Sequence, residues 1–266
     1  MPNVAYVERD ADVSLFAQDI PTGIDRTFAT ANAGIGIDDI DNERVDVDVA
    51  VIDTGVDREH PDLNVVDGVD CASMRGCRGN GDDDHYHGTH VAGTIGAIDH
   101  NDGVVGIAPG ARIHAVKVLN RRGSGRTSWI IAGIDWVAAN SNTIEVANMS
   151  LGGRGYSQAE YDAIQGAVNL GVAFAVAAGN DADLASRYSP AAFDNVLTVS
   201  ALADFNGLPG GGASSTCRND QDDTLADVAN LYSRLQDDGN SNWTDDSGDG
   251  VKEPLLDVSG YAPVLR

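Results

Sequence analysis

The sequence contains only two lysines among 266 residues, and its 17 basic residues face 41 acidic ones, for a formal net charge of −24. So large an excess of negative charge repels nucleic acid and anionic membrane surfaces, which excludes both as partners. No run of about 18 or more apolar residues occurs, so we expect no membrane-spanning helix. The opening residues, MPNVAYVERD, lack a charged segment followed by an apolar core, so they do not resemble a signal peptide.

The surplus of acid, most of it aspartate, has two interpretations. It keeps a protein hydrated in concentrated salt, where screening relieves the repulsion between like charges. The alternative is an acidic secreted protein without salt adaptation. We expect the first, a halophilic protein whose stability rises in molar salt.

Cysteine is scarce, and the three cysteines exclude a disulfide set that is fully paired within this chain. Cys71 and Cys77 flank a short segment, CASMRGC, and would form a bridge in an oxidising compartment. Three free thiols are the alternative, and Cys217 has no obvious partner.

From residue 45 the sequence alternates between strand-like and helix-like segments. Apolar, often β-branched runs predict strands at 45–53, 112–119, 146–150, 172–180 and 196–202. Small residues or helical spacing predict helices at 88–98, 127–139 and 159–170. Apolar strands that alternate with helices indicate an α/β fold, with a mainly parallel sheet covered on both faces.

Polar side chains follow three of these strands, beside glycine or another small residue: Asp53, Ser150 and Asn180. In open α/β sheets, ligands bind beyond the carboxyl ends of the strands. His87 opens a predicted helix, so an acid, a base and an amide donor are expected at one edge of the sheet. A carboxylate can orient an imidazole that accepts a proton from a hydroxyl, while an amide stabilises the developing oxyanion.

The segment GDDDHYHGTHVAG holds three histidines, and we assign them different roles. His87 is the proposed base, and His90, one helical turn later, is expected to be a packed structural histidine. His85 and Asp82–Asp84 form an acidic loop before the helix, where calcium is an open alternative. A metal hydrolase is disfavoured because the segment lacks a helical His-Glu-x-x-His arrangement.

Five segments occur in a recognisable order: DTGVDREHPDL (53–63), HGTHVAGTIGA (87–97), GVVGIAPGARIHAVKVL (103–119), NMSLGG (148–153) and AAGN (177–180). In order and spacing they resemble the subtilisin-like serine peptidases, or subtilases. The resemblance implies a three-layer α/β/α fold and a serine endopeptidase that hydrolyses peptide bonds through an Asp-His-Ser triad.

The resemblance also implies roles for individual residues. Asp53 would orient the base, His87 would act as general base and acid, and Asn180 would donate to the oxyanion. An extended peptide would add as a strand along an edge formed by Ser150, Leu151 and Gly152. The pocket for the residue before the scissile bond would be lined by Ala177, Ala178 and Gly179.

A structural calcium site is implied in the same way, because mixed side-chain and backbone oxygens suit this ion. The implied ligands are the side chains of Gln18 and Asp62 and the backbone carbonyls of Ile98, Asp102 and Val104. His100 departs from the pattern, since it stands where the family usually has an asparagine ligand.

The resemblance divides the chain into three parts. Residues 1–16 resemble the end of an inhibitory propeptide, with a self-cleavage junction near Phe16 and Ala17. Residues 17–235 resemble part of a peptidase domain. Residues 236–266 are expected to be a polar tail, disordered or out of frame. A secreted monomer that binds peptides and its own propeptide would follow.

The family's nucleophile lies in a segment similar to Gly-Thr-Ser-Met-Ala, and no such segment occurs in these 266 residues. We therefore expect a sequence truncated before its catalytic serine, incomplete at the C-terminal end of the fold and inactive by itself. The rival interpretation is an inactive relative that binds peptides without cutting them.

Overall fold

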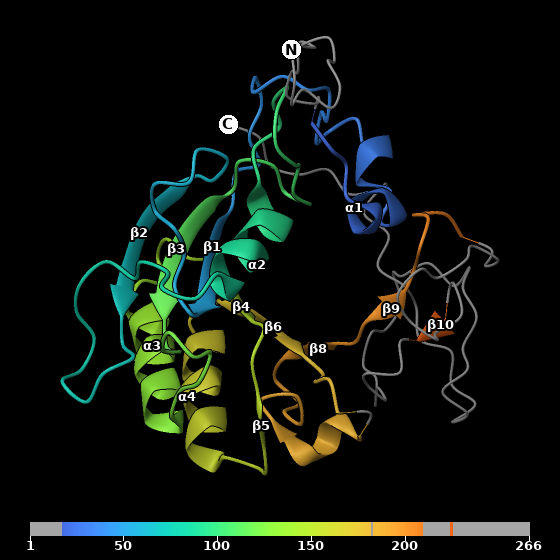
Figure 1. Ribbon diagram of the computed structural model, residues 1–266. Coiled ribbons are helices and arrows are strands. Elements are labelled where there is room, and N and C mark those ends of the chain that lie inside the picture. Colours follow the sequence, from blue (N-terminus) through green and yellow to red (C-terminus); the bar gives the residue numbers. More distant parts are fainter. Residues whose placement is uncertain (1–17, 182, 210–223, 226–266) are drawn as a thin grey trace, which may run out of the picture.

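The computed structural model describes residues 18–181, 183–209 and 224–225 (Figure 1). The predicted propeptide end, the junction at Phe16 and Ala17, the polar tail at 236–266 and Cys217 all lie outside these residues.

A six-stranded, wholly parallel sheet forms the centre of the described fold, in the order β2-β3-β1-β4-β6-β8. The strands are β1 (Asp48–Asp53), β2 (Val65–Asp70), β3 (Arg112–Lys117), β4 (Val146–Met149), β6 (Ala173–Ala177) and β8 (Leu197–Val199). Five of them confirm predicted strands.

Three longer helices confirm the predicted ones: α2 (His87–Gly96), α3 (Thr127–Ala139) and α4 (Gln158–Val168). Among the described helices, none is long and apolar enough to cross a membrane. The shorter elements are α1 (Thr22–Arg26), η1 (Ala29–Ala31), β5 (Gly153–Arg154), η2 (Ala185–Arg187), β7 (Tyr188–Ser189), β9 (Leu202–Ala203) and β10 (Thr224–Leu225). β5 pairs with β7, and β9 pairs with β10, both antiparallel.

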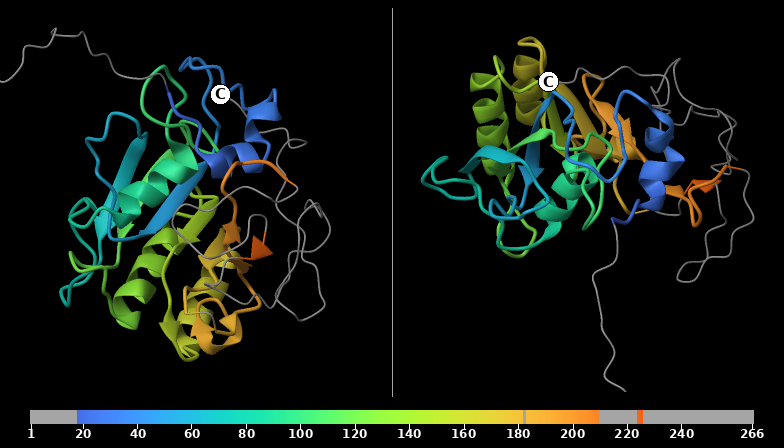
Figure 2. Two further views of the ribbon diagram at one scale, coloured as in Figure 1. Left: turned by 45° about the vertical axis from the view of Figure 1, so that its right-hand side comes forward. Right: turned by 90° about the horizontal axis from the view of Figure 1, so that it is seen from above.

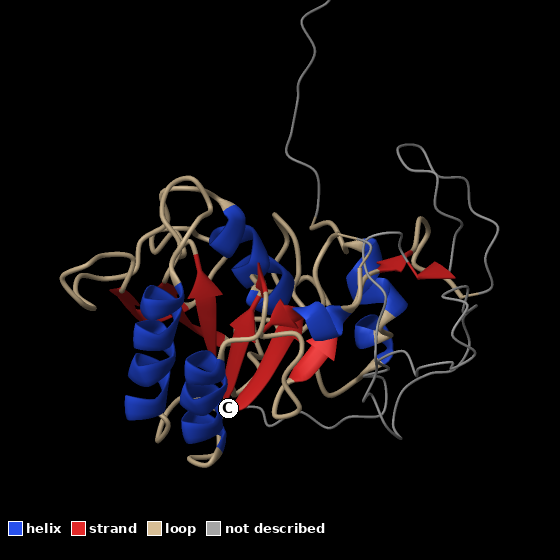
Figure 3. Ribbon diagram, turned by 90° about the horizontal axis from the view of Figure 1, so that it is seen from below, coloured by secondary structure: helices blue, strands red, loops and turns tan. Residues whose placement is uncertain are grey.

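Helices cover both faces of the sheet, as the view from above and the view from below show (Figures 2 and 3). Side chains of a strand alternate between its two faces. In β1, Val49 and Val51 belong to the core cluster that α2 joins through Ala92. Ala50 and Ile52 belong to the larger cluster formed with α3 and α4. The three-layer α/β/α prediction is therefore confirmed for the described residues.

The edge strand β2 was not predicted. Its sequence, VVDGVD, lacks the continuous apolar run of a strand buried on both faces. Gly68 explains how it pairs closely with β3: a Cβ added there would lie 2.7 Å from the carbonyl oxygen of Ala115. A partly polar strand of this kind is typical of a sheet edge.

The strand order places three chemically important ends side by side. β1 ends at Asp53, its neighbour β4 ends just before Ser150, and the next strand, β6, ends three residues before Asn180. Because all three strands run parallel, these residues lie along one edge of the sheet.

Candidate active site

Asp53 and His87 are in direct contact. The Nδ1 atom of His87 lies 2.8 Å from Oδ1 of Asp53. The Asp53 side chain is fully buried, whereas that of His87 is 43% exposed. An ionised Asp53 holds the hydrogen on Nδ1 and leaves Nε2 as the proton acceptor. The pair thus has a buried acid and an accessible base.

The environment of Asp53 affects its charge. Burial raises the pKa of Asp53, and hydrogen bonds from His87 and from the backbone N–H of Thr54 oppose part of this increase. Its second oxygen, Oδ2, is buried and has no hydrogen-bond partner among the described residues. The contact with His87 is therefore the main interaction that stabilises the carboxylate.

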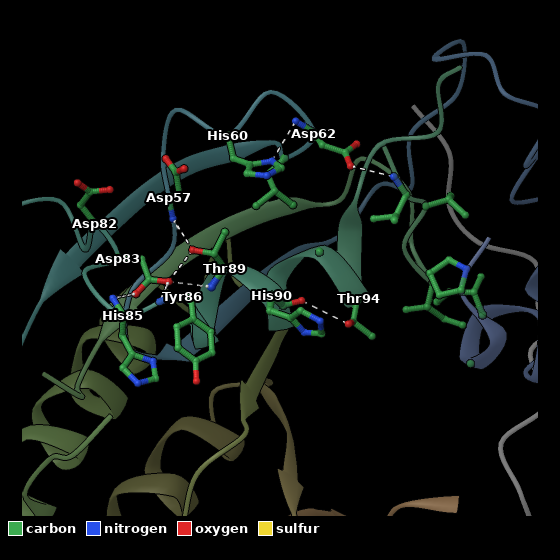
Figure 4. A pocket seen from close by; sticks show the side chains of 18 of the residues that line it. Asp57, His60, Asp62, Asp82, Asp83, His85, Tyr86, Thr89, His90 and Thr94 are labelled. Atoms are coloured by element: carbon green, nitrogen blue, oxygen red, sulfur yellow. Dashed lines mark hydrogen bonds between the residues drawn. The ribbon is translucent and has the colours of Figure 1, made fainter. Parts of the chain in front are cut away.

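Asp83, in the acidic loop, holds the first turn of α2 in place. Its Oδ2 accepts hydrogen bonds from the backbone N–H and the hydroxyl of Thr89, at 3.2 and 2.6 Å. Figure 4 shows this carboxylate directed at Thr89 and at the backbone before the helix. Although burial favours its neutral form, these hydrogen bonds hold the pKa of Asp83 below its usual value. Because His87 begins α2, Asp83 positions the base indirectly.

Thr54 links this cap to β1. Its hydroxyl donates to Oδ1 of Asp83 at 2.9 Å and accepts from the backbone N–H of Gly88 at 2.9 Å. Lys117, which is buried at the end of β3, donates from Nζ to the carbonyls of Thr54 and Leu119 and to Asp84. Strand, loop and helix start are therefore joined by one polar network.

The other histidines of the segment have separate environments. His85 stacks on Tyr86, with ring centroids 4.3 Å apart. The prediction that His90 is packed is wrong for the described residues: the residue is exposed and lines a cavity beside α1 and α2 (Figure 4). Its exposure shows that His90 lies on the solvent-facing side of α2.

The residues predicted to bind substrate surround one cavity of about 760 Å³. Ser150, Leu151 and Gly152 form one wall, and the segment 177–180 forms another. Asn180 therefore lies in the same cavity as both predicted substrate segments. Gly179 has a φ of 110°, a backbone conformation that side chains disfavour, which explains a glycine just before Asn180.

A second cavity, of about 810 Å³, adjoins the first along Ser150–Gly152 and includes His87. Its floor and walls come from α3, α4 and the loops at 119–125 and 150–157. The two cavities together give an extended cleft along the predicted strand-addition edge, with the base at its side.

The predicted calcium ligands gather at one loop, and His100 lies among them. Oδ2 of Asp62 accepts from the backbone N–H of Val104 at 3.3 Å, and Oε1 of Gln18 accepts from the backbone N–H of His100 at 2.8 Å. Nε2 of His100 lies 3.1 Å from Oδ1 of Asp62. Apart from this contact with His100, that buried oxygen has no partner among the described residues, so a cation could satisfy it. The donor set suits calcium, with His100 as a competitor.

Cys71 and Cys77 are joined by a disulfide, with their Cα atoms 4.0 Å apart. The bridge closes the loop between the end of β2 and the acidic segment. Cys71 is fully buried in the larger core cluster.

Three important residues were missed by sequence reasoning: Asp83, Lys117 and Glu160. Lys117 had a signal, since a lysine inside the apolar run AVKVL of a lysine-poor chain needs a buried partner. Asp83 had a weaker signal: it lies a few residues before a helix, whose positive N-terminal end favours a nearby carboxylate. Glu160 had no such signal, because glutamate in the first turn of a helix is ordinarily exposed.

Comparison with known proteins gives consistent matches. A profile described as the subtilase family matches residues 45–252. Subtilisin E of Bacillus subtilis strain 168 is 44% identical over 209 residues, which cover 77% of this chain and 52% of the relative. M-protease of Shouchella clausii is 40% identical over 205 residues, covering 77% and 51%.

A solved structure, the crystal structure of a cold-adapted subtilisin-like serine proteinase, is also similar. It has a TM-score of 0.56 at 37% identity, covering 70% of this chain and 60% of that chain. The chain spans about half the length of the first two curated relatives above.

Proposed function

The chain belongs to the subtilase family, as its motifs predicted, and from this premise we propose that it carries the acid and the base of a serine-type endopeptidase. The observation that carries the proposal is the 2.8 Å contact between His87 Nδ1 and the buried Asp53. The contact lies at the carboxyl end of β1, beside a cleft that also contains Asn180.

The proposed chemistry follows from these positions. His87 takes the proton of a serine hydroxyl at Nε2 as that oxygen attacks the substrate carbonyl, and later gives the proton to the leaving amine. Asp53 stabilises the imidazolium that forms. The side-chain amide of Asn180 donates a hydrogen bond to the carbonyl oxygen as it becomes negative.

The proposed substrate is an extended peptide. Its backbone would pair with the edge at Ser150, Leu151 and Gly152 as an added strand. The residue before the scissile bond would enter the pocket lined by Ala177, Ala178 and Gly179. The adjoining walls of the two cavities support this path.

The nucleophile is assigned to no residue of this chain, because a segment similar to Gly-Thr-Ser-Met-Ala does not occur in it. We therefore propose that these 266 residues alone do not hydrolyse peptide bonds, and that the serine lies in further sequence. Two measurements test this: DNA sequencing past the codon of Arg266 in all three frames, and assays of the chain for casein hydrolysis and phosphonate labelling. Rapid hydrolysis or labelling by the 266 residues would refute the proposal of inactivity.

A non-catalytic peptide-binding role is the second candidate, favoured by the same lack of a serine segment. This role predicts a different outcome from the endopeptidase. The downstream DNA would contain no serine segment, and the chain would bind peptides without cleaving them. A serine segment in the downstream DNA supports the endopeptidase.

Calcium is the proposed structural ion, held by oxygens of Gln18, Asp62, Ile98, Asp102 and Val104. Oδ1 of Asp62 supports it, because this buried oxygen has no partner among the described residues apart from its contact with His100. The nearby His100 imidazole would weaken the site, because it competes for the same carboxylate. A rise in melting temperature with calcium, reversed by chelation, is the expected result.

We further propose a secreted, salt-adapted monomer with a propeptide at 1–16 and a peptidase domain that begins at Ala17. The disulfide and the net charge of −24 support an extracellular, saline setting. N-terminal sequencing of the mature protein tests the junction, and unfolding in increasing salt tests the adaptation.

A further inference from the structure

Glu160 is buried in the first turn of α4 and lines the second cavity, the one that contains His87. The residue is only 3% exposed. Glutamate is rarely buried unless it is paired, because an ionised carboxylate loses its hydration. Its place in the fold therefore needs an explanation.

The usual partners of a glutamate at this helical position are already taken. In a capping box, such a side chain accepts from the backbone N–H of the N-cap residue. Here the N-cap is Ser157, and its N–H donates instead to the hydroxyl of Ser189 at 2.9 Å. The hydroxyl of Ser157 still caps the backbone N–H of Glu160 at 3.3 Å. The carboxylate of Glu160 is thereby left without its local role.

No other described group compensates this carboxylate. Oε1 of Glu160 is buried and has no hydrogen-bond partner among the described residues. Glu160 is also the only acidic residue among the described ones that line this cavity. The cavity's arginines, Arg122 and Arg154, are exposed, and Arg154 pairs with Asp183 instead.

The walls of the cavity suit a long side chain with a charged end. Apolar or partly apolar residues line the same cavity as Glu160: Leu119, Ile130, Leu151 and Tyr156. The alkyl stem of a lysine or arginine can pack against such walls while its head forms a charge-assisted hydrogen bond.

We propose that Glu160 is a specificity-determining residue that selects a lysine or arginine side chain of a bound peptide. This rests on the proposed function, since it takes the cleft to be the place where an extended peptide binds. The basic head would supply the partner that the Glu160 carboxylate lacks within the protein.

The selection should depend on pH. Burial raises the pKa of Glu160 to about 7. The carboxylate is therefore mostly neutral at pH 5.5 and mostly charged at pH 8, so the basic preference should strengthen as pH rises. The other titratable or charged groups that line the cavity are His85, His87, Tyr156, Arg122 and Arg154. A variant without the Glu160 charge separates their contribution.

The test is peptide binding by the full 266-residue chain, measured by titration calorimetry at fixed salt. Neutral, end-capped peptides carry lysine or norleucine at each position in turn, because norleucine has the same stem without the ammonium. At pH 8 we expect lysine to bind about tenfold more tightly at one position, the size of one charge-assisted hydrogen bond. At pH 5.5 this preference should largely disappear.

Two variants provide the comparison. Glu160→Gln should reduce the preference at that position to within about twofold, since a neutral amide cannot pair with the ammonium. Asp162→Asn removes the same charge from an exposed site on the same helix and should keep the preference. If Glu160→Gln does not fold, Glu160→Leu takes its place, since leucine also lacks the charge and should show the same loss of the lysine preference.

The outcomes separate this inference from the proposed function. Peptides that bind without a basic preference, with an acidic preference, or with a basic preference that survives Glu160→Gln, would overturn the inference and leave the peptide cleft intact. A lysine preference of equal size at every position would reflect the overall charge of −24 and would also overturn it. If no peptide binds at all, the proposed peptide cleft and the inference both fail.

Discussion

Replacing Glu160 with leucine should stabilise the protein at high pH and have little effect at low pH. Leucine is apolar and of similar length, so it can fill the position without carrying a charge. The effect arises from an ionisable group whose neutral form is favoured by folding. In the folded chain burial raises the pKa of Glu160 from 4.5 to about 7.

The sign and size follow from proton linkage. Well below pH 4.5 the carboxyl is protonated in both the folded and the unfolded state, so its ionisation does not change the free energy of unfolding. Between pH 4.5 and 7 the unfolded state ionises first, and the free energy of unfolding falls as pH rises. Above pH 7 the cost is complete and, at about 1.4 kcal/mol for each pKa unit, amounts to about 3 kcal/mol. Glu160→Leu removes this cost.

Urea unfolding followed by tryptophan fluorescence can measure the effect, since Trp129 and Trp136 both lie in α3, which packs against α4. The quantity of interest is the difference in free energy of unfolding between Glu160→Leu and the unmodified chain. It should increase by about 3 kcal/mol between pH 4 and pH 8. Asp162→Asn, on the exposed side of α4, serves as the control and should show no such increase.

One result would refute the reasoning: a stability difference between Glu160→Leu and the unmodified chain that is the same at pH 4 and pH 8. The carboxyl would then titrate alike in both states, and Glu160 would be solvated or paired in the folded protein. A packing defect caused by leucine would lower the stability of the variant equally at both pH values, so it would not hide the expected increase between them.

The other predictions concern the base, its support, the metal site and the disulfide. In a complete, active form of the protein, Asp53→Asn should lower kcat by about 10⁴-fold, because the imidazole loses the partner that sets its tautomer. A peptide-ester assay measures this rate. An unchanged rate would show that Asp53 has no part in the mechanism. Asp83→Ala should destabilise the fold by about 1–2 kcal/mol at pH 7 through loss of the cap on α2. Since the pKa of Asp83 is lowered, that deficit should shrink as pH falls below the usual aspartate range, which acid unfolding curves can check. His100→Asn should increase the rise in melting temperature caused by calcium, measured against a chelator, whereas an unchanged calcium response would show that His100 does not compete for Asp62. Reduction of the disulfide between Cys71 and Cys77 should cost about 2 kcal/mol, as estimated for so short a loop, measured by unfolding with and without reductant.

Five strands of the central sheet and their mainly parallel pairing could be predicted from local patterns. Residues 112–119 and 146–150 are rich in apolar residues because parallel strands are buried on both faces, and this pattern is visible without coordinates. The same holds for the polar residues that end strands, so Asp53, Ser150 and Asn180 could be assigned to one edge before the order of the strands was known. The strand β2 was not predicted, because an edge strand needs no continuous apolar run.

The support of the candidate site could be predicted only in part. The acid and base were identifiable because motifs mark them, and the structure places Asp53 and His87 2.8 Å apart. The cap formed by Asp83 and the buried amine of Lys117 depend on how a loop folds back on β1 and β3. The exposure of His90 depends likewise on which side of α2 faces the sheet, which helical spacing alone did not decide.

The sequence by itself determined the family, the alternation of strands and helices, and the acid, base and amide expected at the sheet edge, since each depends on residue type and order. Only the tertiary structure decided the environment of Glu160. Its position in the chain, three residues after Ser157, is that of an exposed capping residue, but Ser189 takes the N–H that it would have accepted from. Burial of the carboxylate then follows from the packing of α4 against the cleft. Such packing joins residues far apart in the chain, so no local pattern records it.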